Sequence, residues 1–196
     1  MTVLYVILGA IAGYMLDFEF LRHSQALVEP VIYLMIFVSG LGIGYSLRKR
    51  RPEKKLLFHI ITTPVFSVIG SLFGGVLFGR FIGYDLWQSC LLSSGMGWYS
   101  LTSVMISKYD VTLGLLSLMI NLFREMLALM LTPAVAKYIG YLEAVTPGGA
   151  TCMDTTLGVI SASTDENTTI VAFSTGTILM IAVPAMTEFF LGMNFR

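Results

Sequence analysis

Charge is scarce in this sequence. Lysine, arginine, aspartate and glutamate together make up 12% of the 196 residues, and twelve basic and twelve acidic residues give a formal net charge of zero. A chain with no excess of positive charge lacks the electrostatic basis for binding nucleic acid. No polar stretch is long enough to form a soluble domain. We therefore expect neither a nucleic-acid partner nor a separate soluble domain.

Cysteine is nearly absent, and so are the common enzyme motifs. Cys90 and Cys152 show no CxxC or Cys/His spacing, so the sequence predicts neither a metal site nor a disulfide framework. It has no HExxH, no glycine-rich phosphate loop and no paired-aspartate protease motif. Neither His23 nor His59 is placed to activate Ser100 or Cys152 as a base. We expect a protein that is not an enzyme, with no catalytic residue and no cofactor.

Apolar residues fill the chain instead. They make up 56% of it, and the mean hydropathy is +0.80, well above that of a soluble domain. Nothing alternates with the period of an outer-membrane barrel, so the sequence predicts an all-α polytopic membrane protein. A bilayer-spanning helix needs about 20 apolar residues. On that basis we place about seven membrane segments, near 2–17, 29–47, 56–80, 86–107, 111–139, 150–163 and 168–193.

Basic residues are concentrated in one loop. The stretch "RKRRPEKK" at 48–55 contains half of the lysines and arginines, and such loops face the cytoplasm. That orientation places the N-terminus and the turn at 107–110 in the cytoplasm, and the loop at 141–149 outside. Because the N-terminus has no basic region and no clear cleavage site, we interpret 2–17 as a membrane segment rather than a removable signal.

Small residues recur at a spacing of four. Such pairs let helix backbones approach closely, so they predict tight packing against neighbouring helices. The glycine pairs are Gly9 with Gly13, Gly40 with Gly44, Gly70 with Gly74, and Gly75 with Gly79.

Two of the predicted segments, 2–17 and 150–163, are unusually short. The second follows Pro147, Gly148 and Gly149, which do not fit easily inside a continuous helix. Interrupted segments at corresponding positions of two halves mark the binding site of inverted-repeat transporters. They are the first and the sixth of the predicted segments. If each repeat contained five helices, they would occupy the same position in the two repeats. We predict an inverted-repeat transporter-like helical bundle with at least one discontinuous segment.

The fifth segment contains "NLFREMLALM", which places Arg124 beside Glu125 in apolar surroundings. A charged side chain at this depth costs roughly 2.5–3.5 kcal/mol on insertion scales, so it indicates a functional role. Asn121 shares a helix face with Glu125, whereas Arg124 points about 100° away from Glu125. We expect the two charges to have separate partners. The alternative is a structural pair in which Arg124 ties down a neighbouring helix end and neutralises Glu125.

Asp154 is predicted to be a second buried acid. It lies a few residues after the glycine break, with Thr151 nearby, so it suits either a ligand or a helix N-cap. In "SSGMGWYSLTS" at 93–103, two glycines weaken the helix just before Trp98, Tyr99 and Ser100. An ammonium group held against one of these aromatic rings would gain about 0.5–2 kcal/mol. The alternative is an aromatic residue at a helix end.

Three blocks together carry a family resemblance: "GMGWYSLTS" (95–103), "NLFREMLALMLTP" (121–133) and "GGATCMDTTL" (148–157). In this order and at these separations they resemble the lysine exporter family, LysO-like inner-membrane proteins of bacteria and archaea. The resemblance implies export of L-lysine, and of analogues such as thialysine, across the cytoplasmic membrane of a prokaryote. It also implies coupling to protons, with sodium as the other possible ion, and membrane-embedded acids that are essential.

Position by position, the resemblance implies a set of substrate and ion contacts. These are Glu125, Asp154, Asn121, Arg124, Trp98, Tyr99, Ser100, Thr151 and Gly149. Cys152 stands where a serine is common in the family. Family members also carry a further N-terminal stretch, so the chain resembles the large C-terminal part of a split exporter. We expect the lipid bilayer around it and a small membrane subunit that supplies the missing helices, or else a homodimer.

A transport hypothesis follows. Glu125, with Asp154, pairs alternately with the lysine ammonium and with a proton, while Arg124 or the half-helix N-terminus near Asp154 receives the carboxylate. Two other classes remain open. One is a sodium/proton antiporter or organic-anion:sodium symporter of similar fold, and the other is a non-transporting membrane assembly subunit.

Overall fold

The computed structural model describes residues 34, 37, 41, 45 and 54–195 of the chain. The chain divides into two units, residues 1–38 and 39–196, and the architecture below is that of residues 54–195. The predicted segments near 2–17 and 29–47 therefore lie outside the continuous described part.

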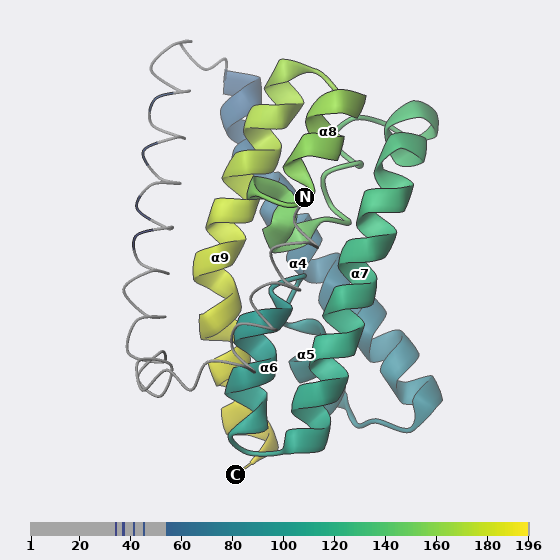
Figure 1. Ribbon diagram of the computed structural model, residues 1–196, viewed down its shortest axis with the longest axis vertical. Coiled ribbons are helices and arrows are strands. Elements are labelled where there is room, and N and C mark those ends of the chain that lie inside the picture. The colour runs from purple at the N-terminus through teal and green to yellow at the C-terminus, as the bar shows by residue number, and fades with distance from the viewer. Residues whose placement is uncertain (1–33, 35–36, 38–40, 42–44, 46–53, 196) are drawn as a thin grey trace, which may run out of the picture. The chain divides into compact units, whose positions relative to one another are not determined.

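Three long helices form the frame of this part: α4 (Lys54–Ile82), α7 (Val111–Tyr138) and α9 (Glu166–Asn194) (Figure 1). Each has 28 or 29 residues and so spans roughly 42 Å at 1.5 Å per residue. All three are long and apolar enough to cross a membrane. The described residues contain only helices and turns, without strands. The predicted all-helical, multi-pass membrane architecture is confirmed for this part of the chain.

The predicted segment at 86–107 is not a single helix. It consists of α5 (Leu86–Ser93) and α6 (Tyr99–Ser107), joined by a turn in which Met96 has φ +47° and Gly97 has φ +95°. A left-handed backbone at two consecutive residues cannot continue an α-helix. Both helices lie in the same half of the bundle (Figure 1). The segment is a hairpin, named hairpin 1 here, that returns to the end where it entered.

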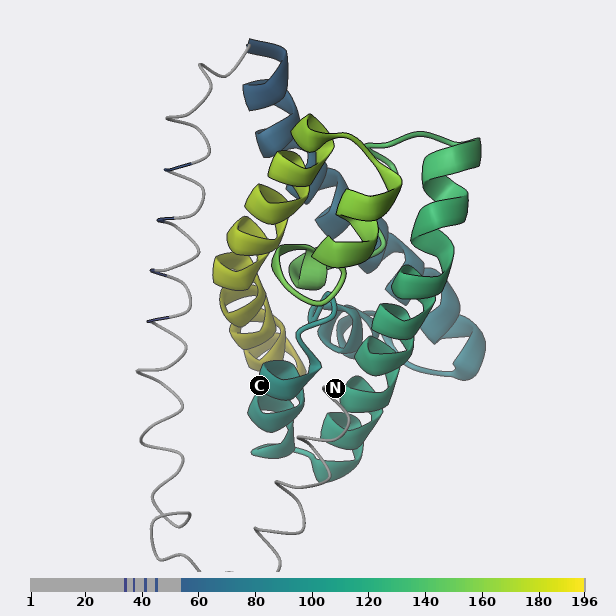
Figure 2. The ribbon, with the colours of Figure 1, turned by 45° about the horizontal axis from the view of Figure 1, so that its top comes forward.

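A second hairpin, hairpin 2, occupies residues 140–164. Its inward arm consists of turns and the 3-10 helix η1 (Gly149–Met153), and its outward arm is α8 (Leu157–Ser163). The predicted break near 150–163 is present. The hairpin enters and leaves at the end of the bundle where α9 begins, opposite to hairpin 1 (Figures 1 and 2).

This arrangement reverses the predicted sides of two loops. Lys55, at the start of α4, lines a cavity together with Tyr141 and Asp165, so the loop after α7 lies at the same end as Lys55. At the opposite end, Tyr109 stacks on Phe195 with ring centroids 5.3 Å apart.

The predicted inside position of 107–110 and outside position of 141–149 are therefore wrong relative to Lys54 and Lys55, the described end of the basic loop. The physical reason is hairpin 1. Because it turns back instead of crossing, α7 runs in the direction opposite to the one expected.

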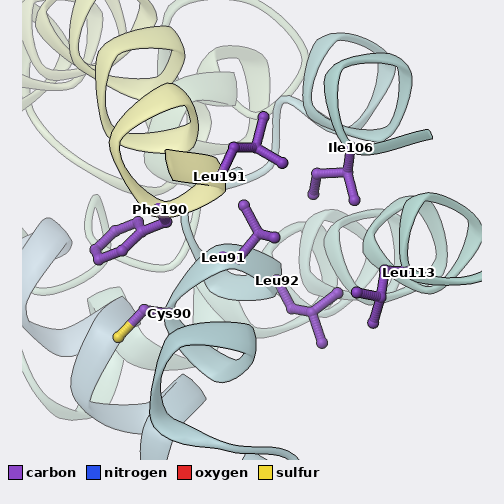
Figure 3. Packing of buried hydrophobic residues seen from close by; sticks show 7 residues of the cluster. All are labelled: Cys90, Leu91, Leu92, Ile106, Leu113, Phe190 and Leu191. Carbon is purple, nitrogen blue, oxygen red and sulfur yellow. The ribbon is translucent and has the colours of Figure 1, made fainter. Parts of the chain in front are cut away.

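Three apolar clusters are stacked along α9. The first contains Leu91, Ile106 and Leu191 and packs hairpin 1 against the end of α9 (Figure 3). The last packs hairpin 2 against Ala172, near the start of α9. The middle one joins the two hairpins, since it contains Met96 of hairpin 1 and Ala150 of hairpin 2, together with Leu179 and Val183 of α9. The tips of both hairpins therefore meet at the centre of the bundle.

Helix starts are set by aspartates. Asp85, Asp110 and Asp165 each accept a hydrogen bond from the backbone N–H three residues later, at the N-termini of α5, α7 and α9. Such caps satisfy N–H groups that have no partner inside the helix. A charged residue thus marks the start of each of these three helices.

Candidate functional site

The two hairpin tips touch through their backbones. The Ala150 N–H donates a 2.9 Å hydrogen bond to the Met96 carbonyl. The residue before it, Gly149, has φ +63°, and a β-carbon there would overlap the Met96 carbonyl oxygen. At Gly97, a β-carbon would come within 3.1 Å of Thr151. Only glycine combines the left-handed backbone with so close an approach at these two positions.

Asn121 of α7 holds the tip of hairpin 1. Its Oδ1 accepts a 3.0 Å hydrogen bond from the Gly97 N–H, and its Nδ2 donates to the carbonyls of Leu92 at 3.2 Å and Ser117 at 2.9 Å. The side chain is 1% exposed. The protein itself engages both ends of this amide, so Asn121 fixes the break between α5 and α6.

Arg124, one turn further along α7, holds the entry to hairpin 2. Its Nε donates to the Pro147 carbonyl at 3.0 Å, and its terminal nitrogens donate to Ser71 Oγ at 2.8 Å and to the Thr146 carbonyl at 3.4 Å. Ser67 of α4 donates to the same Thr146 carbonyl at 3.2 Å. Arg124 thereby ties α4 and hairpin 2 to α7.

The expectation of separate partners for the two adjacent charges is confirmed. Arg124 bonds only to neutral oxygens, and no carboxylate among the described residues pairs with it. Glu125 lies on another side of α7 and is 6% exposed. Thr155 and the charge of Asp154 both influence the electrostatics of the Glu125 carboxylate. The alternative of mutual neutralisation is wrong, although its other element, an arginine that ties down a neighbouring segment, is present.

Four side chains form what we name the acid cluster: Tyr99, Glu125, Asp154 and Thr155. Tyr99, at the start of α6, interacts electrostatically with both carboxylates, and the two carboxylates interact with each other. The cluster thus unites hairpin 1, the middle of α7 and the turn between η1 and α8. Two carboxylates that repel each other favour uptake of a cation or a proton between them.

Asp154 differs from the prediction in one respect: it is exposed rather than buried. The chain leaves the tight turns of η1 at this residue, which is the C-cap of that helix. Nor does Asp154 cap α8, whose N-cap is Thr156. Its side chain accepts a hydrogen bond from the neighbouring Thr155 N–H. An exposed carboxylate beside the buried Glu125 gives the acid cluster an accessible side.

The other predicted contacts are not part of the acid cluster. Trp98 is half-buried and packs against the cluster at the hairpin tips, and Ser100 is exposed in the first turn of α6. Thr151 is buried and donates to the Gly148 carbonyl at 2.9 Å, while Gly149 contributes its backbone. Of the nine predicted residues, the structure brings together Tyr99, Glu125 and Asp154.

Sequence reasoning missed the partners of the Asn121 amide and the Arg124 guanidinium. Ser71, Ser117 and the carbonyls of Thr146 and Pro147 were not predicted. The one available signal was Pro147 itself, since a proline before a glycine pair marks backbone carbonyls that a helix cannot satisfy. In the described part of the chain, no group of three or more histidine, cysteine, aspartate or glutamate residues could hold a metal ion.

Comparison with known proteins covers nearly the whole chain. Residues 3–191 match the family model described as "Lysine exporter LysO". A "Putative lysine exporter" of Haemophilus influenzae is 30% identical over 189 residues, which are 94% of this chain and 94% of that protein. "Lysine exporter LysO" of Escherichia coli is 26% identical over 94% of this chain, which spans 61% of that protein's length. No solved structure matches.

The family match and the relatives agree with the apolar helices, the broken hairpins and the buried acid described above. A transporter needs such features, whereas no enzyme motif is present in the sequence. The chain is a multi-pass membrane protein that belongs to the lysine exporter family, a family of transporters rather than enzymes.

Proposed function

We propose that the chain exports L-lysine, and analogues such as thialysine, in exchange for protons. The observation that carries this proposal is the acid cluster, in which the buried Glu125 lies beside the exposed Asp154 where two broken hairpins meet. The printed names of the two relatives, both lysine exporters, support the substrate.

The exchange rests on competition for one carboxylate. A lysine ammonium between Glu125 and Asp154 offsets their mutual repulsion, and Tyr99 offers its ring face and hydroxyl to the same group. Protonation of Glu125 from the outside removes its charge and so releases the ammonium. Loss of that proton to the cytoplasm restores the binding site, so an inward proton gradient drives lysine outward.

For the substrate carboxylate we propose the backbone N–H groups of hairpin 2 near Asp154. Arg124 is the other candidate. Its hydrogen bonds run to Ser71, Thr146 and Pro147 instead. Those contacts favour a role for Arg124 in holding the hairpin.

We also propose an inverted repeat, though a different one from that expected. α4 with hairpin 1 would be one unit, and α7 with hairpin 2 the other, inserted in the opposite direction (Figure 1). In that scheme the second broken segment is 86–107 rather than 2–17. The membrane is the inner membrane of a prokaryote with the N-terminus in the cytoplasm, and a small membrane subunit or a second copy completes the transporter.

The decisive experiment is Glu125→Gln. This change removes the charge but keeps the shape, so cells that depend on the protein should lose thialysine resistance while the variant still inserts and retains its thermal stability. Glu188→Gln is the matched control, because Glu188 is an exposed acid on α9 and lies outside the acid cluster. Full resistance in Glu125→Gln cells would refute the assignment.

Binding measurements separate the remaining classes. The purified protein should be stabilised by lysine in a thermal unfolding assay, and this stabilisation should disappear in the Glu125→Gln variant. Stabilisation by sodium or by a simple carboxylate instead would favour the antiporter or symporter class. A non-transporting assembly subunit would show altered stability but unaltered lysine flux when Glu125 is changed.

A further inference from the structure

Arg124 carries a charge for which the described residues supply no counter-ion. It is the middle residue of the 28-residue helix α7, so it lies near the centre of the membrane. A guanidinium has five N–H groups, and three donate to neutral oxygens, which leaves two without an acceptor in the described part. A positive charge at this depth pairs with acids or with backbone carbonyls. Arg124 has two carbonyls and a hydroxyl but no acid among the described residues, so an anionic partner would balance its charge.

Arg124 also lines a groove of about 860 Å³. One wall is α4, on which Phe66, Gly70, Gly74 and Phe78 follow one another at intervals of four residues. The other wall is α7, which contributes Leu116, Ile120 and Arg124 at the same interval. Residues four apart form the ridges into which a neighbouring helix packs. The groove therefore has two ridged walls, as a site for a third helix requires.

Two glycine pairs on α4 show which part of the groove is unfilled. A β-carbon at Gly75 would overlap Ser93, and one at Gly79 would overlap Ser89, because α5 already packs there. A β-carbon at Gly70 or Gly74 would meet nothing within 4 Å. The first pair shows close helix packing inside the chain. The second pair offers the same close approach to a helix from elsewhere.

We propose that this groove binds a transmembrane helix of a separate membrane subunit, which presents small residues to Gly70 and Gly74 and a carboxylate to Arg124. Charge complementarity selects this partner. Acyl chains could fill the groove but could not neutralise the guanidinium.

A second copy of the chain fits less well. The described acids lie near helix ends or in the acid cluster, so a copy offers no free carboxylate at this depth. The acids of residues 1–53 are Asp17, Glu19, Glu29 and Glu53, all at or beyond the ends of the predicted segments. The proposal that a helix binds in this groove does not depend on which substrate the protein carries.

A synthetic transmembrane peptide tests the proposal. The probe is a leucine/alanine helix with one Gly-x-x-x-Gly pair and a central glutamate on the same face, reconstituted with the purified protein in lipid nanodiscs. We expect it to bind at least ten-fold more tightly than the same peptide with glutamine, measured by fluorescence energy transfer. That preference should vanish in the Arg124→Gln variant. Equal affinity of the two peptides, or binding of neither, overturns the proposal.

Glycine variants provide a test that leaves Arg124 intact. Gly70→Ile and Gly74→Ile should fold, since their side chains meet open space, yet each should lower peptide affinity at least ten-fold. Gly192→Ile on α9, where a β-carbon also meets nothing within 4 Å, is the matched control and should bind normally. Unchanged peptide binding in Gly74→Ile contradicts the proposal. So does a wild-type protein that self-associates through the groove and becomes monomeric in Gly74→Ile.

Discussion

The two hairpins differ in how their tips are held. Hairpin 1 has two α-helical arms, begins with a capping box at Asp85, and is fixed by the neutral Asn121. Hairpin 2 enters through turns and a 3-10 helix, is fixed by the charged Arg124, and carries the exposed Asp154 in the turn between η1 and α8. Hairpin 1 forms a fixed wall, whereas hairpin 2 brings an acid to a place where it can be reached.

The comparison shows how one helix serves both hairpins. Asn121 and Arg124 are one turn apart on α7; Asn121 holds the tip of hairpin 1 and Arg124 the entry to hairpin 2. Glu125 points to a different side of the helix and is influenced by the charge of Asp154. The helix α7 thus fixes both hairpins and also carries Glu125, the acid that we propose binds the substrate. Changes at the first two residues should affect stability, and changes at Glu125 should affect transport.

Removing the hold on hairpin 2 should have the largest effect on stability. Arg124→Met leaves the Pro147 carbonyl without its donor, at about 1–3 kcal/mol. It also removes the bond to Ser71 and one of the two donors to the Thr146 carbonyl, which keeps only Ser67. We expect a loss of about 2–5 kcal/mol in the free energy of unfolding, measured by denaturation in mixed micelles.

Membrane insertion separates this effect from a simple defect of biogenesis. Insertion of α7 should be no worse in Arg124→Met, because an uncharged side chain enters the bilayer more easily. Arg124→Lys should be intermediate in stability, since an ammonium can reach one acceptor but lacks the planar fork of a guanidinium. Wild-type stability in Arg124→Met would show that hairpin 2 holds itself in place.

Removing the hold on hairpin 1 should have a smaller effect. Asn121→Leu leaves the Gly97 N–H and the Leu92 carbonyl without partners, and we expect a loss of about 1–3 kcal/mol in the free energy of unfolding. The control is Asn194→Leu, because Asn194 bonds the Phe190 carbonyl at the end of α9 and holds no hairpin. An equal loss in the two variants would mean that Asn121 acts only within its own helix.

The sequence was sufficient to predict the long helices but not the hairpins. Apolar runs of spanning length correspond directly to α4, α7 and α9. The stretch 86–107 is also long enough to span, so composition could not distinguish a crossing from a return. Gly95 and Gly97 did mark the weak point. The left-handed turn at Met96 and Gly97, which reverses the direction of α7, is a tertiary property that hydropathy does not encode.

Prediction of the site succeeded where helical geometry decides it. Neighbouring residues on a helix point in different directions, which was enough to separate Arg124 from Glu125. Helical geometry could not identify the hydrogen-bond acceptors of Arg124, because two of them are backbone carbonyls that any residue type would offer. The exposure of Asp154 depends on how η1 unwinds into α8, and no residue pattern reports that.

The smallest predicted effect lies at the exit of hairpin 2, where Asp165 caps α9. The hydrogen bonds from the side chain and the backbone N–H of Thr168 lower the pKa of this carboxyl. A carboxyl whose pKa is lower in the folded state stabilises the fold above its unfolded pKa of about 3.9, and that contribution is lost as the pH falls through the folded pKa. Asp165→Ala should therefore be less stable than wild type at pH 7 by no more than about 1 kcal/mol, and the difference in melting temperature should shrink below about pH 4. Thr168→Val removes one of the two donors and should reproduce part of the loss in melting temperature at pH 7. If the difference in melting temperature between wild type and Asp165→Ala stays constant down to pH 3, the cap acts through its shape and not through its charge.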